Sequence, residues 1–244
     1  NQEFGKDGTM RTHLIVGAIG KNAAVSIESH TWETDGFDSI NGSSNNTGFD
    51  KDDVVIKFRF NSDIDLNSTY HEINFKYQDS DEISDQSYVG LADADFRKNP
   101  HARYGLTAYD EMDNNHDQWS INYIADFGKL EVSATIYENE FARNWFKVDK
   151  IDNKKVYGLG NGINNIIDAA NQGKSGGSAI LNGTNAQAVE IQLKNNNRAY
   201  TSEGTDLKIQ YNTNRQSLTV SYRSTEDSED RFQVYEYANW NGGK

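Results

Sequence analysis

Four arginines fall in or beside the long polar loops of the sequence, and several aromatic residues lie next to them. The guanidinium group is a planar fork of donors that binds a carboxylate through two hydrogen bonds. This pattern indicates a binding site for an anion that carries carboxylates. The alternative is that the arginines neutralise acids of the same loops, and the sequence leaves both open. The residues are Arg97, Arg103, Arg143 and Arg198, with Tyr104, Trp145 and Tyr200 close by.

Catalytic chemistry has weaker support in the sequence. The chain has 37 Asp and Glu residues, and Asp93/Asp95 or Asp110/Glu111 have the residue types of acid–base catalysis. A glycosidase would need two carboxyl groups about 5–10 Å apart, and sequence spacing does not fix that separation. The five histidines are scattered, without the spacing of metal ligands. We therefore expect no enzyme, no catalytic residues and no metal ligands.

Motifs for cofactors are incomplete. Asp50–Asp53 and Asp93–Asp95 resemble parts of calcium-binding loops but lack the full alternation of acids that ends in glycine. Calcium on acidic loops stays an alternative, and no cofactor is expected. Gly158–Gly162 lacks the strand–turn–helix context of a dinucleotide site. The absence of cysteine removes disulfides and thiolate chemistry.

The composition describes a folded and acidic protein. Of 244 residues, 35% are hydrophobic and 11% are aromatic, and the aromatic content is higher than that of disordered chains. Mean hydropathy is -0.83. The formal net charge of -13 disfavours nucleic acid as a partner, because phosphate binding needs a basic surface. No apolar run is long enough for a transmembrane helix, whereas the strands of a membrane barrel would leave only a weak alternation.

Helical periodicity is nearly absent, and alternation of apolar and polar residues predicts about eight strands. Val54, Ile56, Phe58 and Phe60 alternate with polar neighbours in the clearest of them. The connections are short and long in turn, as in an up-and-down meander. The predicted strands are 12–19, 23–34, 54–61, 72–78, 119–127, 130–136, 198–212 and 218–223.

The long connections are predicted to lie at one end of the meander and to carry function. They are Asp35–Asp52, Asp79–His116 and Phe141–Asn197. The stretch from Tyr88 to His116 is expected to face a substrate, because loops longer than about 12–15 residues are usually functional. Gly158–Gly183 is rich in Gly, Asn and Ser and low in complexity, and its first part, Gly158–Gly162, is expected to be a flexible loop. A small strand is expected at 189–193.

Aromatic residues flank the aliphatic segments at both ends, as in the two interfacial girdles of a membrane barrel. We therefore predict an all-β fold, an antiparallel up-and-down transmembrane β-barrel with long extracellular loops, of which about eight strands are present. A soluble β-sandwich is the alternative, although Greek-key crossovers would break the regular order of loop lengths. The flanking aromatic residues are Phe60, Tyr77, Trp119, Phe127 and Tyr211.

Several segments, in order along residues 30–235, resemble the TonB-dependent outer-membrane receptors of the ferric-dicitrate type. The likeness is densest between Tyr88 and His116, whereas Gly158–Gly183 matches poorly. The matching segments are Asp35–Phe37, Gly48–Asp53, Tyr88–Leu91, Asp93–Phe96, Asn99–Pro100, Arg103–Tyr104, Met112–Asp113, His116, Arg143–Trp145, Lys147 and Ser228–Gln233.

The resemblance implies a receptor in the bacterial outer membrane. Such receptors are roughly 22-stranded barrels with an N-terminal plug, and they take up a ferric chelate with energy from the TonB complex. Residues 1–244 would then form part of one barrel domain, without the plug and without the segment that contacts TonB. The expected partners are the ferric chelate, outer-membrane lipid and TonB through a part not present here. No nucleic acid is expected.

The predicted function is thus uptake of a ferric chelate, citrate-like or another siderophore. In this hypothesis Arg97, Arg103 and Arg143 donate charge-assisted hydrogen bonds to the anionic complex, and Tyr104 and Trp145 close over it. The assignment rests on residue type and loop position. The alternative function is a soluble extracellular β-rich module that binds carbohydrate through loop Tyr and Trp side chains.

Overall fold

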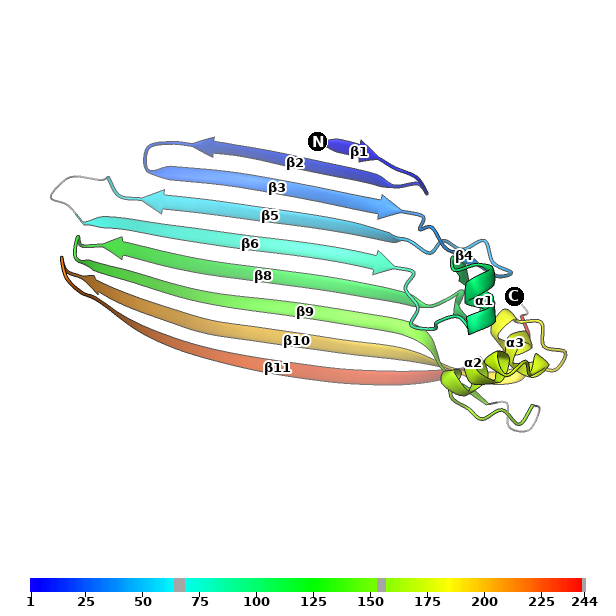
Figure 1. Ribbon diagram of the computed structural model, residues 1–244. Coiled ribbons are helices and arrows are strands. Elements are labelled where there is room, and N and C mark those ends of the chain that lie inside the picture. The colour runs from blue at the N-terminus through cyan, green and yellow to red at the C-terminus, as the bar shows by residue number, and fades with distance from the viewer. Residues whose placement is uncertain (64–68, 153–156, 243–244) are drawn as a thin grey trace.

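The computed structural model describes residues 1–63, 69–152 and 157–242, and one antiparallel sheet of nine strands dominates it (Figure 1). The strands lie in the sheet in their chain order, so the sheet is an up-and-down meander with β1 and β11 at its edges. This confirms the all-β, antiparallel up-and-down architecture. The strands are β1 (Gln2–Phe4), β2 (Met10–Ile19), β3 (Ala23–Thr34), β5 (Phe49–Asn61), β6 (Tyr70–Ser84), β8 (Glu111–Asp126), β9 (Leu130–Asp152), β10 (Val189–Asn212) and β11 (Ser217–Trp240).

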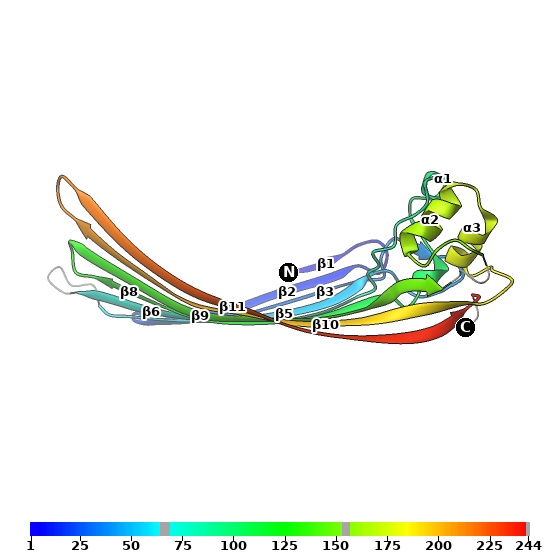
Figure 2. The same cartoon turned by 90° about the horizontal axis from the view of Figure 1, so that it is seen from below.

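The remaining elements gather at one end of the sheet, which we call the loop end (Figure 1). The opposite end, the turn end, has the tight connections 20–22, 127–129 and 213–216. Figure 2 shows the three α-helices standing on one side of the sheet. The loop-end elements are the parallel pair β4 (Ser39–Ile40) and β7 (Ala102–Arg103), the 3-10 helix η1 (Gly105–Thr107), and the helices α1 (Asp93–Lys98), α2 (Ile163–Asn171) and α3 (Ser175–Asn182).

Alternation along each strand and the register between strands assign every sheet residue to one of two faces. Phe58 lies opposite Val25 and Phe75, and the same row continues through Ile121 and Ile136. Neighbouring rows towards the turn end are also apolar, and we call this side the apolar-band face. Phe58 is 37% exposed. A contiguous apolar surface left exposed indicates contact with a partner or a membrane.

The other side carries every Lys and Arg of the nine strands, and we call it the cationic face. The apolar-band face beyond its band carries acids instead, with Asp79 directly opposite Asp117 and Glu138 opposite Glu203. The strand cations are therefore confined to one face, whereas acids lie on both faces, among them Glu28, Asp53 and Glu72 on the cationic face. The cations are Arg11, Lys51, Lys57, Arg59, Lys76, Arg143, Lys147, Lys150, Lys194, Arg198, Lys208, Arg223 and Arg231.

The hydrophobic core of the chain lies at the loop end, in a cap formed by α2, α3, η1 and the adjoining ends of β9 and β10. Ile166 and Ile180 are fully buried between the two helices and the strands. Val189 and Ile191 share the face of the apolar band, so the cap packs on that side of the sheet. The core residues are Tyr104, Leu106, Val148, Ile151, Ile163, Ile166, Ile180, Leu181, Val189 and Ile191.

Several predicted boundaries are wrong because the strands continue past the apolar band. Both faces are polar there, so hydrophobic alternation stops while the backbone ladder continues. β6 extends to Ser84 and β8 begins at Glu111, which shortens the predicted loop Asp79–His116 to 85–110. β5 begins at Phe49, within the predicted loop Asp35–Asp52. The predicted tail after Arg223 continues as β11, and β1 was not predicted.

The segment Phe141–Asn197 differs most from the prediction. β9 extends to Asp152, and residues 189–193 belong to β10 instead of a separate small strand. Gly158–Gly183, expected to be a low-complexity part of a long loop, contains α2 and α3. Its Gly and Asn content hides a helical spacing of Ile163, Ile166, Ile167 and Ala170, which places apolar side chains on one side of α2.

Candidate anion-binding site

Three arginines lie directly opposite one another on adjacent strands in the loop-end half of the cationic face. Arg143 on β9 is opposite Arg198 on β10, and Arg198 is opposite Arg231 on β11. Residues opposite in antiparallel strands have Cβ atoms about 4.5–5.5 Å apart, and like charges in this position repel. We call these three residues the arginine row. The repulsion within it favours binding of negative charge.

The described residues supply the arginine row with few acceptors. Glu229 Oε1 lies 3.2 Å from Arg231 Nη2 and 3.6 Å from Arg198 Nη1. Arg198 Nη1 also donates to Tyr200 Oη at 3.1 Å, and this hydrogen bond raises the pKa of Arg198. Within the described chain, the guanidinium of Arg143 forms no hydrogen bond or ion pair, and its buried Nε lacks an acceptor, as does that of Arg198. The arginine row therefore has guanidinium N–H donors that are not hydrogen-bonded within the described residues and that could bind a carboxylate.

Aromatic side chains border the arginine row on its turn-end side. Phe141 and Tyr200 are stacked with ring centroids 6.1 Å apart at 28°. His116 packs edge-on against Phe141, with centroids 6.0 Å apart. Gly204 provides room for the next large side chain on this face, because a Cβ there would lie 2.6 Å from the hydroxyl of Tyr137. The aromatic rings give the cationic site a rigid and partly apolar border.

Two lysines extend the positive charge on the loop-end side of the row. Lys147 lies directly opposite Lys194, and Lys194 Nζ is 3.9 Å from Asp149. Lys147 Nζ lies 4.0 Å from the ring centroid of Tyr88 and 3.7 Å from that of Trp145, which are cation–π distances. Burial lowers the pKa of Lys147, and the charge of Lys194 lowers it further, against the opposing effect of Asp149.

Hydrogen bonds connect the loop 85–110 to β9 next to this site. Trp145 Nε1 donates to the carbonyl of Gln86 at 3.1 Å. The buried carboxyl of Asp110 accepts the backbone N–H of Val148 at 3.0 Å and the hydroxyl of Ser87 at 2.6 Å. Burial raises the pKa of Asp110 to about 6, although both hydrogen bonds and the charges of Arg103 and Lys147 oppose the shift.

The five residues predicted to bind ligand fall into two groups. Arg143 belongs to the arginine row, and Trp145 lies beside it. Arg97 is exposed at the end of α1. Arg103 is half-buried and donates to the backbone carbonyls of 85 and 107, while burial lowers its pKa. Tyr104 is buried in the cap core, where its hydroxyl donates to Asp95 and accepts the N–H of residue 92.

Sequence reasoning missed Arg231, Lys147 and Lys194 as members of this site. Arg231 lies in a segment that reads as an acidic tail, and only the register of β10 with β11 brings it beside Arg198. Arg198 and Arg231 are 33 positions apart in the sequence, and pairing over that separation leaves no local sequence pattern. Lys147 and Arg143 do share a face by alternation, and that signal is readable once β9 is extended past residue 140.

The described residues hold no group of three His, Asp or Glu side chains placed to bind a metal ion. Asp50–Asp53 lies within β5, and Asp93–Asp95 begins α1. No helix in the part of the chain that the structure describes has the length and apolarity to cross a lipid bilayer.

Comparison with known proteins gives a structural likeness alone. No protein-family model and no curated protein matches the sequence. Among solved structures, the chain is similar to the siderophore receptor PiuA from Acinetobacter baumannii, with a TM-score of 0.57 and 11% sequence identity. The likeness covers 93% of this chain and 29% of the receptor, so the chain spans less than a third of that receptor's length. At this identity the comparison shows a shared antiparallel sheet, as in a barrel receptor.

Proposed function

We propose that this chain forms part of the wall of an outer-membrane transport receptor and that the arginine row binds an anionic ferric chelate. The apolar-band face would contact lipid, and the cationic face would line the interior. Residues 1–244 would belong to one barrel domain, and TonB would act through a segment outside this chain. The chelate is the cargo, and the chain itself carries no cofactor and no catalysis in this proposal.

The observation that supports the binding site most strongly is the shortage of negative charge around the arginine row. The row and the two adjoining lysines form ion pairs with only Glu229 and Asp149 among the described residues. This occurs in a chain whose formal net charge is -13. Guanidinium groups in a line match the planar carboxylates of a citrate-like chelate, and the stacked rings of Phe141 and Tyr200 border the row on one side.

The fold supports the transport part of the proposal. The long connections gather at one end and the tight turns at the other, as in outer-membrane barrels. The apolar band is exposed, and Tyr77 and Trp119 lie opposite each other at its loop-end margin. A solved siderophore receptor shares this sheet arrangement. The sequence resemblance and the chemistry of the row are the reasons for proposing a citrate-like cargo.

Equilibrium binding of ferric citrate to the purified protein in detergent tests the proposal. We expect Arg143→Gln and Arg198→Gln each to weaken binding by about 10- to 150-fold, because a hydrogen bond to a charged group contributes roughly 1.5–3 kcal/mol. Intrinsic fluorescence would report binding, since Trp145 lies beside the row.

Lys208→Gln is the matched control, because Lys208 lies on the same strand and face as Arg198 but near the turn end. It should leave ferric citrate affinity unchanged. Equal affinity of the wild-type protein and the Arg143→Gln/Arg198→Gln double variant would remove the arginine row from the binding site. A soluble carbohydrate-binding module would instead remain in solution without detergent and would not bind ferric citrate.

A further inference from the structure

A second cationic site lies at the turn-end half of the cationic face, away from the arginine row. A cavity of about 500 Å³ opens there between β2, β3, β5, β6 and β8. Its polar lining includes Ser26, Lys57, Arg59, Lys76 and Asn122. Cavities of roughly 300–1,000 Å³ accommodate small molecules. The cavity contains no carboxylate among its lining residues.

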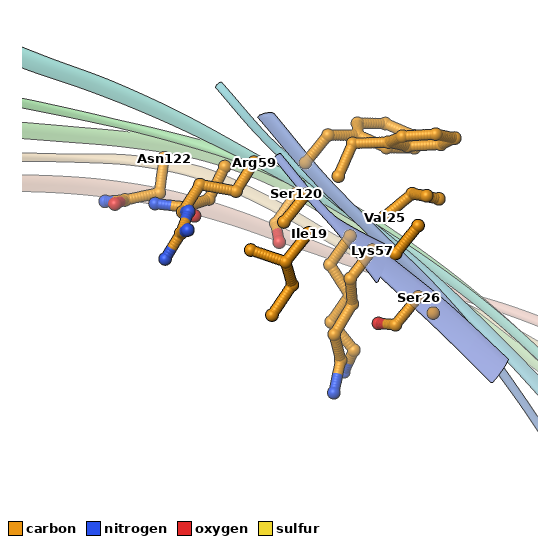
Figure 3. A pocket seen from close by; sticks show the side chains of 14 residues that line it. Ile19, Val25, Ser26, Lys57, Arg59, Ser120 and Asn122 are labelled. Carbon is orange, nitrogen blue, oxygen red and sulfur yellow. The ribbon is translucent and has the colours of Figure 1, made fainter. Parts of the chain in front are cut away.

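The polar and charged lining residues come from different strands and lie on one side of the sheet. Figure 3 shows the side chains of Ile19, Ser26, Lys57 and Arg59 pointing to the same side, whereas Val25 points to the other. This agrees with the register, in which Lys57 pairs with Ser26 on β3 and with Lys76 on β6. The cavity therefore belongs to the cationic face and not to the apolar band behind it.

The charges in the cavity are poorly neutralised. Lys57 and Lys76 lie directly opposite each other, a position in which like charges repel. Lys76 Nζ donates to the neutral Gln118 Oε1 at 3.3 Å. Lys57 and Arg59 form no ion pair among the described residues, and the buried Nε of Arg59 has no acceptor. An anion in the cavity would relieve the repulsion and satisfy this donor.

Two acids near the turn end already accept hydrogen bonds, and one of them, Glu72, also interacts electrostatically with Arg59. Glu72 accepts hydrogen bonds from the hydroxyl of Tyr70 and from Asn74 Nδ2. Asp63 pairs with Lys21 at 2.8 Å in the exposed turn region. Neither carboxylate lines the cavity. The cavity thus keeps a local positive charge in a chain of formal net charge -13.

We propose that this cavity is a second anion-binding site, which takes a small multivalent anion with carboxylate or phosphate groups through Lys57, Lys76 and Arg59. Ser26, Ser120 and Asn122 supply neutral polar groups around the charged ones. The site is separate from the arginine row. Lys51 lies at the level of Arg143 in the register, and Lys57 is six residues further along β5, or about 20 Å at 3.3 Å per residue. The inference does not depend on the function of the arginine row.

Isothermal titration of inorganic pyrophosphate and, separately, of citrate tests the second site. The background is the full chain in detergent with Arg143→Gln/Arg198→Gln, so that the arginine row does not contribute. We expect saturable binding of at least one probe there, and Lys57→Gln/Lys76→Gln should weaken it at least tenfold. Preference for pyrophosphate would identify a phosphate ligand, and preference for citrate a carboxylate ligand.

Lys208→Gln is again the control, because Lys208 lies on the same face outside the cavity. It should leave probe binding within about twofold of the background protein. Lys57→Arg keeps the charge and should keep binding, which separates loss of charge from loss of fold. The proposal is overturned if neither probe binds below about 10 mM, or if Lys57→Gln/Lys76→Gln binds as the background does. Occupation of the cavity by an acidic segment of another chain would give the first of these results.

Discussion

Arg143 and Asp110 both lie in the loop-end half of the molecule, but Arg143 lacks partners within the described chain, whereas Asp110 is hydrogen-bonded. Arg143 has a charge without a partner among the described residues. Asp110 has two hydrogen-bond donors and is 3% exposed, so its ionisation is costly. Arg143 is therefore available to bind a ligand, whereas Asp110 links the loop 85–110 to β9 through hydrogen bonds. Residue type alone does not distinguish these roles, because Arg103 is also an arginine but donates its hydrogen bonds to backbone carbonyls of its own loop.

Asp110→Asn should change how stability depends on pH. Folding raises the pKa of Asp110 to about 6 through burial, so the folded state holds this proton more tightly than the unfolded state, where the pKa is about 3.9. The stabilising contribution is complete below about pH 4 and is lost as pH rises through about 6. Asparagine keeps an acceptor for the N–H of Val148 and cannot ionise.

We therefore expect Asp110→Asn to flatten the pH dependence of stability between about pH 4 and 6. At pH 7 it should raise the free energy of unfolding by about 3 kcal/mol, because the pKa differs by about two units between the folded and unfolded states and each unit corresponds to about 1.4 kcal/mol. Thermal unfolding at a series of pH values measures this effect. A variant with the same pH slope as the wild-type protein would show that Asp110 does not set it.

At the scale of elements, the helices α2 and α3 provide the apolar core that the sheet itself lacks. Leu181 and Ile180 are fully buried, and Gly183 ends α3 in the left-handed conformation with φ of 68°. This segment was predicted as a low-complexity part of a long loop because Gly, Asn and Ser dominate its composition. The spacing of Ile163, Ile166 and Ile167 was the readable signal, and it was outweighed by composition.

Leu181→Ala should destabilise the cap by about 2–5 kcal/mol, because it leaves a cavity among buried apolar side chains. The effect should be local, with faster amide exchange in α2 and α3 and little change in β5 and β6. Hydrogen exchange with mass spectrometry measures both regions. Leu218→Ala is the control, since Leu218 is 64% exposed in the apolar band. Uniform exchange changes across the chain would contradict a separate cap core.

The strands divide into a part that the sequence predicts and a part that it does not. Val54–Phe60 and Leu130–Ile136 have the expected faces, and the turns at 20–22, 128–129 and 213–215 are confirmed. In these segments one face is apolar, so alternation is visible. In the loop-end halves of β9, β10 and β11, residues 143–144, 195–198 and 226–231 are polar on both faces, and only backbone pairing reveals them as strand. The arginine row lies in those halves and was therefore not predictable as a unit.

At the scale of the whole molecule, the sheet separates its side chains into two environments. All Lys and Arg of its strands lie on one face, and the apolar band lies on the other. Burial of apolar side chains explains why the cap is stable. It does not explain the apolar band, whose side chains are exposed; Val220, for example, is 58% exposed. Such a division fits a wall with lipid on one side and a polar ligand on the other.

Quenching of tryptophan fluorescence by brominated lipid tests this division most directly. The chain has four Trp residues. Trp119 lies on the apolar-band face opposite Tyr77, and Trp145 lies on the cationic face beside the arginine row. In vesicles, the account expects strong quenching that Trp119→Phe largely removes and Trp145→Phe preserves. A protein that stays in buffer without quenching, or one whose quenching is insensitive to Trp119→Phe, would contradict it.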